Sequence, residues 1–182
     1  MAQSLSDSYE YTVKQKQEGK ILLRKILLIA VYILYVITVL TVALLTRLAA
    51  PAIAFIPITL WILIHFTYLY CNIEYEYSMM DGYITFSTIY GSRKCKEGFS
   101  MRISAFEKVC PYNEDYAKIL EQFDPSRIYS AFSSENTPDD PYFAIFKDKN
   151  GKKCVFFFEA TNRALRIMKY YNENTVMTVV KI

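Results

Sequence analysis

The side chains that could carry out catalysis are few and scattered along the chain. The only histidine, His65, lies in a long apolar stretch, whereas a Ser-His-Asp or Cys-His system needs a histidine beside its nucleophile. The five glycines form neither a GxGxxG nor a P-loop spacing, so no loop is built to hold phosphates. We therefore predict that the protein is not an enzyme and has no catalytic residue and no bound cofactor.

Metal binding and thiol chemistry are the next possibilities. Asp139 and Asp140 are adjacent, but Pro141 follows them and no other acid cluster stands nearby, so we interpret them as a solvated loop and predict no metal. Cys95 stands among three basic residues that would favour its thiolate, and an ordinary thiol on a strand is the alternative. The cysteines show no CxxC spacing, which is typical of reduced, mostly structural residues. They are Cys71, Cys95, Cys110 and Cys154.

Two apolar stretches near the N-terminus predict helices that cross a membrane. Residues 26–45 carry no charge, and about 20 such residues at 1.5 Å each span the roughly 30 Å hydrocarbon core. A second uncharged stretch covers about 49–69, where Pro57 should bend the helix. The few residues between them make the two helices antiparallel neighbours. A cleavable signal peptide is disfavoured because its apolar region is shorter and no second crossing would follow.

The charges that flank these stretches predict their orientation. Five Lys and Arg residues precede the first helix, whereas Arg47 stands alone in the connecting loop. Both termini should therefore face the cytoplasm in a multi-pass protein of the cell membrane. We predict three regions: a cytoplasmic N-terminal segment (1–20), a transmembrane helical hairpin (21–71, with crossings at about 26–45 and 49–69) and a cytoplasmic β domain (72–182).

Polar and aromatic residues in the first two regions support more specific predictions. Leu5, Tyr9 and Val13 recur every four residues and favour a short helix on the inner leaflet, with a polar tail as the alternative. His65 lies about four residues from the membrane exit among aromatic residues, so we interpret it as an interfacial anchor rather than part of an ion pathway. Tyr32 and Tyr35 lie deeper, and we predict that one of them hydrogen-bonds across the helix pair.

Strand-like alternation opens the domain that follows. Between Asn72 and Met79 apolar and polar residues alternate, which is the period of a half-buried strand. Asp81 and Gly82 provide a two-residue hairpin turn, and pairing through it gathers the apolar side chains of both strands on one face. A third strand over about 93–103 completes an antiparallel meander.

The rest of the domain mixes helices and strands. Asn113 can cap a helix that ends near Asp124 and carries its apolar side chains on one face. The two strands predicted after residue 141 are apolar on both faces, so other elements should cover both faces. An amphipathic helix that begins near Thr161 is the natural cover. We predict a strand at 127–132, a loop at 133–141, and strands at 142–146 and 154–158 joined through Asn150 and Gly151.

This order of elements resembles the bacterial PH-like domains found beside membrane hairpins. In finer detail, the N-terminal hairpin, the run NIEYEYSMMDGYITFSTIYGSRKCK and the later FEKVCPY resemble an uncharacterised family of small Firmicute membrane proteins. The resemblance implies a membrane-anchored α+β protein: a two-helix transmembrane hairpin followed by a mostly antiparallel β, PH-like domain with a C-terminal amphipathic helix. It supplies no catalytic residue, and PH-like folds serve many unrelated binding roles.

Two basic segments of the β domain are the candidate contact sites. Near an anionic inner leaflet each such charge contributes about 1 kcal/mol of attraction. The alternative is that they are solvated charges that keep the domain soluble and protect strand edges. A net charge of +3 is too small to predict nucleic-acid binding. The candidates for contact with anionic lipid or a partner are Arg93, Lys94, Lys96, Lys149, Lys152 and Lys153.

These features favour a binding or scaffolding module that is tethered to the lipid bilayer and contacts anionic lipid or a protein partner. An accessory subunit of a larger membrane complex is the alternative, and a membrane-bound enzyme is the weakest candidate because site chemistry is missing.

Overall fold

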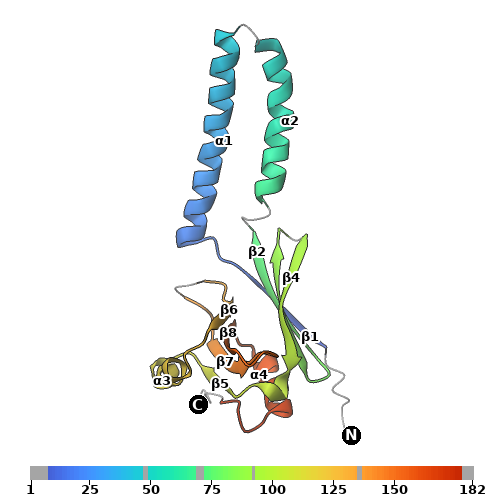
Figure 1. Ribbon diagram of the computed structural model, residues 1–182, viewed down its shortest axis with the longest axis vertical. Helices are drawn as coiled ribbons and strands as arrows, with labels where there is room; N and C mark the ends of the chain where they lie inside the picture. Colours follow the sequence, from blue (N-terminus) through green and yellow to red (C-terminus); the bar gives the residue numbers. More distant parts are fainter. Residues whose placement is uncertain (1–7, 47–48, 69–71, 92, 135–136, 178–182) are drawn as a thin grey trace. The chain divides into compact units, whose positions relative to one another are not determined.

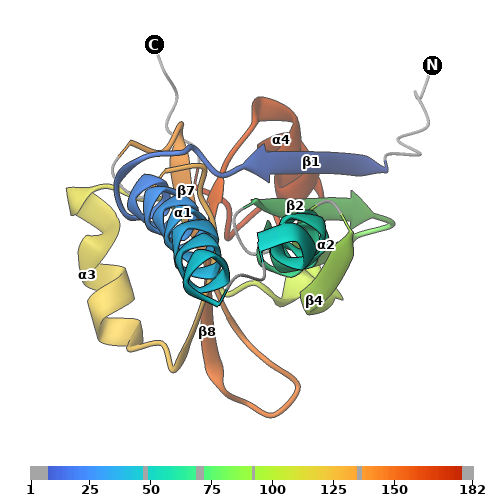
Figure 2. The same cartoon turned by 90° about the horizontal axis from the view of Figure 1, so that it is seen from above.

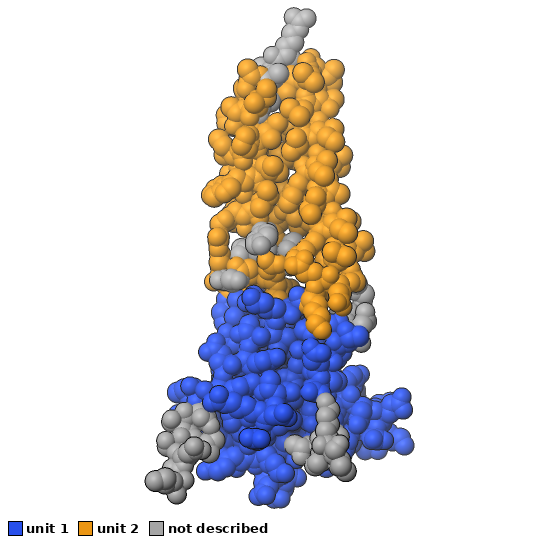
Figure 3. Space-filling model, turned by 180° about the vertical axis from the view of Figure 1, so that it is seen from behind, with its two compact units in different colours: residues 1–15, 74–89, 95–182 blue, residues 16–73, 90–94 orange. Residues whose placement is uncertain are grey.

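The computed structural model describes residues 8–46, 49–68, 72–91, 93–134 and 137–177. The chain forms two compact units, which Figure 3 shows in orange and blue. The helical unit comprises residues 16–73 and 90–94. The β unit comprises residues 1–15, 74–89 and 95–182.

The helical unit is built from two long helices, α1 (Gly19–Leu45) and α2 (Ala49–Tyr68), which lie side by side in both ribbon views (Figure 1, Figure 2). Within α1, Ile21–Leu45 is long and apolar enough to cross a membrane, whereas the apolar part of α2, Ile53–Thr67, is shorter. Large apolar side chains of both helices are exposed, as in Leu27 and Trp61 at 64% and 67%. An exposed apolar surface of this kind indicates membrane association.

Two hydrogen bonds join the helices, as predicted for Tyr32 and Tyr35. The Tyr32 hydroxyl bonds to the Thr67 hydroxyl, and the Tyr35 hydroxyl donates to Thr59 Oγ1 at 2.6 Å. Each threonine hydroxyl in turn donates to the carbonyl oxygen four residues earlier in α2, at 2.6 Å for Thr67 and 3.0 Å for Thr59. The prediction is confirmed, and both tyrosines take part instead of one.

The β unit begins with a four-stranded sheet, here sheet A, whose strand order is β1-β2-β3-β4 (Figure 1). The predicted turn at Asp81 and Gly82 is confirmed: both residues have positive φ, 51° and 78°, as a type I′ hairpin requires. Tyr77 and Met79 are buried on β2, as are Ile84 and Phe86 on β3, which agrees with the predicted apolar face. The strands are β1 (Tyr9–Lys14), β2 (Ile73–Met80), β3 (Tyr83–Tyr90) and β4 (Lys94–Arg102).

Strand β1 corrects the prediction for the N-terminal segment. Residues 9–14 form neither a helix nor a tail but pair antiparallel with β2, from Tyr9 opposite Met79 to Lys14 opposite Glu74. The alternation of Tyr9, Tyr11 and Val13 with polar residues is the sequence signal for this strand, and Tyr9 and Val13 are buried. The two helices are therefore inserted between neighbouring strands of one sheet, and the β unit begins before them rather than at residue 72.

A second sheet, sheet B, has the order β5-β7-β8-β6. Its central hairpin was predicted, and so was β6, which runs parallel to β8. Strand β5 was not predicted because four residues are too few to show alternation, and its Val109 also bridges Val176 near the C-terminus. The strands are β5 (Lys108–Pro111), β6 (Arg127–Ala131), β7 (Pro141–Lys147) and β8 (Lys153–Glu159).

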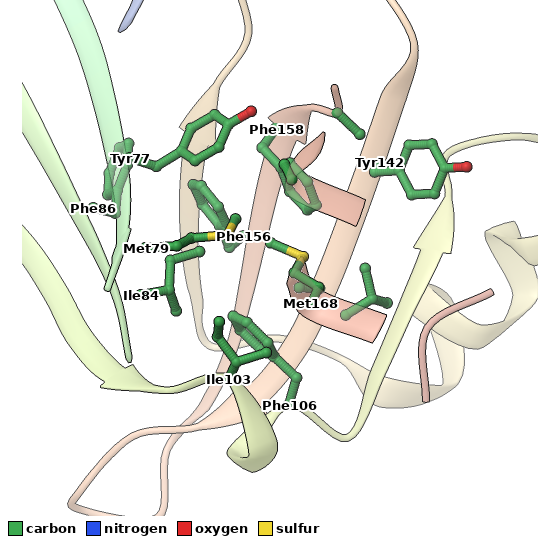
Figure 4. Close-up of a cluster of buried hydrophobic side chains, with 14 of the residues drawn as sticks. Tyr77, Met79, Ile84, Phe86, Ile103, Phe106, Tyr142, Phe156, Phe158 and Met168 are labelled. Atoms are coloured by element: carbon green, nitrogen blue, oxygen red, sulfur yellow. The ribbon is translucent and has the colours of Figure 1, made fainter. Parts of the chain in front are cut away.

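Sheet B is covered on both faces, as its apolar pattern predicts. On one face, side chains from sheet A, sheet B and helix α4 (Asn162–Tyr171) form the main core, including Tyr77, Phe156 and Met168 (Figure 4). A short helix, η1 (Ile103–Ala105), contributes to the same core. On the other face, α3 (Glu114–Phe123) covers a second cluster. The predicted cap of α3 is present, since the Asn113 side chain accepts a hydrogen bond from the Tyr116 N–H group. Helix α4 begins where predicted, and the Thr161 side chain caps it by accepting from the Ala164 N–H group.

Candidate functional site

The first predicted basic group lies in the turn between β3 and β4. Gly91 adopts a φ of +58°, its N–H donates to the Asn72 carbonyl oxygen at 2.7 Å, and Arg93 N–H donates to the Tyr90 carbonyl oxygen at 3.2 Å. The first bond joins the turn to Asn72, the residue that precedes β2, and the second closes the turn itself. The side chains of Lys94 and Lys96 are exposed.

Polar contacts in the helical unit extend from this turn to α1 and α2. Arg93 Nη1 lies 3.4 Å from His65 Nδ1, and Lys25 Nζ donates to Asn72 Oδ1 at 3.1 Å. Because a guanidinium can only donate, the His65 nitrogen is the acceptor in this contact. The His65 ring also lies 5.5 Å from that of Trp61. This polar and aromatic setting agrees with the interpretation of His65 as an interfacial anchor.

The second basic group lies in the turn between β7 and β8. Asp148 Oδ1 organises this turn by accepting from the N–H groups of Asn150 and Lys152 at 2.8 and 2.9 Å. Lys153 Nζ lies 5.5 Å from the centre of the Phe123 ring, a cation–π contact. All three lysines of this group are exposed, and Lys153 is the one whose side chain also contacts an aromatic ring.

The described cysteines divide by burial. Cys110 and Cys154 are buried, and desolvation raises the pKa of both thiols, so they are structural and poor nucleophiles at neutral pH. Cys95 is exposed on β4. Cys71 lies outside the described residues.

A buried carboxylate that the sequence did not reveal lies at the end of β8. Glu159 Oε1 accepts from the N–H and the hydroxyl of Ser133 at 2.8 and 2.6 Å, which holds the chain that follows β6. The Tyr77 hydroxyl donates to the Glu159 carbonyl oxygen at 2.7 Å, and burial raises the pKa of Tyr77. Over the described parts of the chain, no three His, Cys, Asp or Glu side chains gather in a way that could hold a metal ion.

The β unit also contains a pocket of about 710 Å³ between α4 and the ends of β5 and β7. No motif marks it, because its residues come from segments far apart in the sequence. A smaller hollow of about 310 Å³ shares Asp140, Ala160 and Asn162 with it. The main pocket is lined by Pro111, Tyr112, Asn113, Asp140, Pro141, Tyr142, Ala160, Asn162, Leu165, Arg166 and Lys169.

A match to a protein family covers both sheets, helix α4 and the inserted helices. Residues 6–178 match the family model described as bacterial PH-like domain (DUF6106). The chain belongs to this family. The DUF6106 match starts before β1 and runs through both helices to the end of the described chain, so it includes the insertion. No curated protein and no solved structure matches the chain.

Membership in DUF6106 confirms the PH-like part of the expected resemblance, whereas the Firmicute origin stays a prediction. Within this PH-like chain the predicted contact residues separate into two groups. Arg93, Lys94 and Lys96 lie at the sheet A turn, and Lys149, Lys152 and Lys153 lie at the sheet B hairpin.

Proposed function

We propose that the protein is a non-enzymatic binding module held at the cell membrane by two crossings, α1 and α2, with the β unit in the cytoplasm and the basic β3–β4 turn in contact with anionic lipid. The observation that carries this proposal is the pairing of β1 with β2 on either side of the two helices.

This pairing limits how many times the chain can cross a bilayer. Lys14 and Glu74 are partners in one sheet, so they lie on the same side of any membrane. The chain between them must then cross an even number of times. If α1 crosses, a return crossing by α2 keeps both strands on one side, so the pairing supports two crossings.

The composition of α2 supports a return crossing although its most apolar part is short. At 1.5 Å per residue, the stretch Ile53–Thr67 covers about 22 Å of the roughly 30 Å hydrocarbon core. Residues 49–52 are also uncharged and extend the stretch at its start. Thr59 and Thr67 satisfy their hydroxyls inside the helix pair, which lowers the cost of placing them in lipid.

The positive-inside rule supports the cytoplasmic side for the β unit. Lys20, Arg24 and Lys25 lie at the start of α1, whereas the connection between the helices carries Arg47 alone. The β3–β4 turn is hydrogen-bonded to the chain just after α2, so Arg93 and Lys94 lie near the residues that leave the membrane. Each such charge contributes about 1 kcal/mol of attraction to an anionic leaflet.

Lipid contact can be tested with a soluble β unit in which residues 16–72 are replaced by an Asn-Gly turn, so that β1 stays joined to β2. We expect this protein to float with vesicles that contain phosphatidylglycerol, but not with neutral vesicles, and to be released by 0.5 M salt. Arg93→Gln, Lys94→Gln and Lys96→Gln together should abolish flotation, whereas Lys149→Gln with Lys152→Gln should weaken it less. A folded protein that never floats would rule out lipid contact by the β unit.

A further inference from the structure

We propose that the pocket beside α4 binds an organic anion, namely a carboxylate or phosphate group carried on an apolar or aromatic body. None of the residues that line it belongs to the basic turns, so the proposal goes beyond the lipid contact and does not depend on it. A volume of about 710 Å³ lies within the roughly 300–1,000 Å³ of small-molecule sites.

Two cations on one face of α4 set the charge of the pocket. Arg166 and Lys169 are three residues apart in the helix, so their side chains project from the same face. Both are exposed, and within the described chain no ion pair engages either of them. A guanidinium beside an ammonium can hold a carboxylate or phosphate through charge-assisted hydrogen bonds.

Other polar side chains of the pocket can donate hydrogen bonds to an anion. Asn113 Oδ1 already accepts from Tyr116 N–H at 3.2 Å as the cap of α3, so its NH₂ group is the part left for a ligand. The Asn162 amide and the Tyr112 hydroxyl can also donate. Among the described residues that line the pocket, Asp140 supplies the one carboxylate, and its backbone oxygen accepts from Ala160 N–H at 3.0 Å. A ligand that brings acceptor oxygens can therefore use these donors together with the two cations.

Apolar surfaces beside these donors call for an apolar body on the ligand. Pro111, Pro141 and Leu165 supply aliphatic surface. The Tyr112 ring packs edge-on against Phe157, with ring centres 5.3 Å apart, so it is held in place before a ligand arrives. A free inorganic anion would leave these surfaces uncovered.

The full-length protein in detergent micelles can be tested by ligand-observed NMR titration. Phenyl phosphate and benzoate should bind, whereas benzylamine and benzyl alcohol, which have the same ring without the negative charge, should not. A capped peptide with glutamate beside phenylalanine distinguishes the source of the anion. Tighter binding of this peptide than of benzoate would support an acidic segment of a protein partner, and weaker binding would support a free small molecule.

Variants locate the binding. Arg166→Gln with Lys169→Gln should weaken phenyl phosphate binding at least about tenfold, and a second variant, Tyr112→Ala, should also weaken it. Lys118→Gln with Lys152→Gln removes the same charge elsewhere and should leave binding unchanged, as should the triple Gln variant of the β3–β4 turn. Absence of anion binding, equal binding of benzylamine, or unchanged affinity in the Arg166 and Lys169 variant would overturn the proposal.

Discussion

Tyr32 and Tyr35 of α1 each bond to a threonine hydroxyl of α2, and in lipid such bonds have few competitors. Replacing both by phenylalanine should weaken association of the helix pair by about 0.6–2 kcal/mol, measured by unfolding in mixed micelles. Thr38→Val with Thr41→Val is the matched control, because those hydroxyls donate only to carbonyl oxygens of α1 itself. An equal loss in the control would show that the cross-helix bonds contribute nothing.

Glu76 on β2 gives the β unit a predicted pH dependence. Partial burial and the nearby Glu10 carboxylate raise its pKa above 4.5. The folded state thus favours the protonated form, and this contribution to stability is lost as pH rises through the folded pKa. Glu76→Gln should stabilise the β unit at pH 7 by up to about 1 kcal/mol. Above pH 4.5 the free energy of unfolding of this variant should also change less with pH than that of the wild-type protein.

Urea unfolding of the soluble β unit at pH 4.5 and pH 7 measures this effect. Glu97→Gln, an exposed position on β4, controls for the loss of one negative charge. If both variants gain the same stability at pH 7, the effect is one of net charge and not of the Glu76 and Glu10 pair.

At the scale of residues, the sequence predicts whether a side chain is exposed or buried better than it predicts which residue that side chain contacts. Exposed basic residues and buried cysteines follow from residue type, and the cross-helix tyrosines follow from depth along the helices. The contact of Lys153 with Phe123 and the burial of Glu159 beside Ser133 could not be predicted, because they depend on segments brought together only by the fold.

Strand β1 makes a sharp test at the scale of elements. Val13 is 3% exposed whereas its neighbour Thr12 is exposed, as expected for alternate faces of a strand. Val13→Asp should destabilise the soluble β unit by about 3 kcal/mol or more because it buries an unpaired charge, and Thr12→Asp should change stability by under about 1 kcal/mol. Circular dichroism with thermal unfolding measures both, and similar stabilities would contradict the assignment of β1.

The elements that were predicted carry strong local signals, and those that were missed do not. The Asp81–Gly82 turn and the cap at Asn113 are set by backbone chemistry within a few residues. In β1 two periods compete, since Tyr9 and Val13 fit a helical spacing of four as well as the strand period of two. Pairing with β2, which lies more than 50 residues further along the chain, selects the strand. The pocket beside α4 could not be predicted from the sequence for the same reason, because its lining residues are far apart in the chain.

At the scale of the whole molecule, the proposed membrane topology depends on the insertion of α1 and α2 between two paired strands. In chain order β1 precedes α1 and β2 follows α2, and these two strands pair with each other. Composition and charge predicted two apolar helices, but the requirement for an even number of crossings comes from the fold.

The most direct test of two crossings is the side of the membrane on which single cysteines react. In a background with Cys71 and Cys95 replaced by serine, the buried Cys110 and Cys154 can remain. Ala50→Cys at the start of α2 should react with a membrane-impermeant maleimide outside right-side-out vesicles. Thr12→Cys and Lys118→Cys in the β unit should react only after permeabilisation. Reaction of all three positions from the same side would contradict the account, because α1 and α2 would then not cross the membrane.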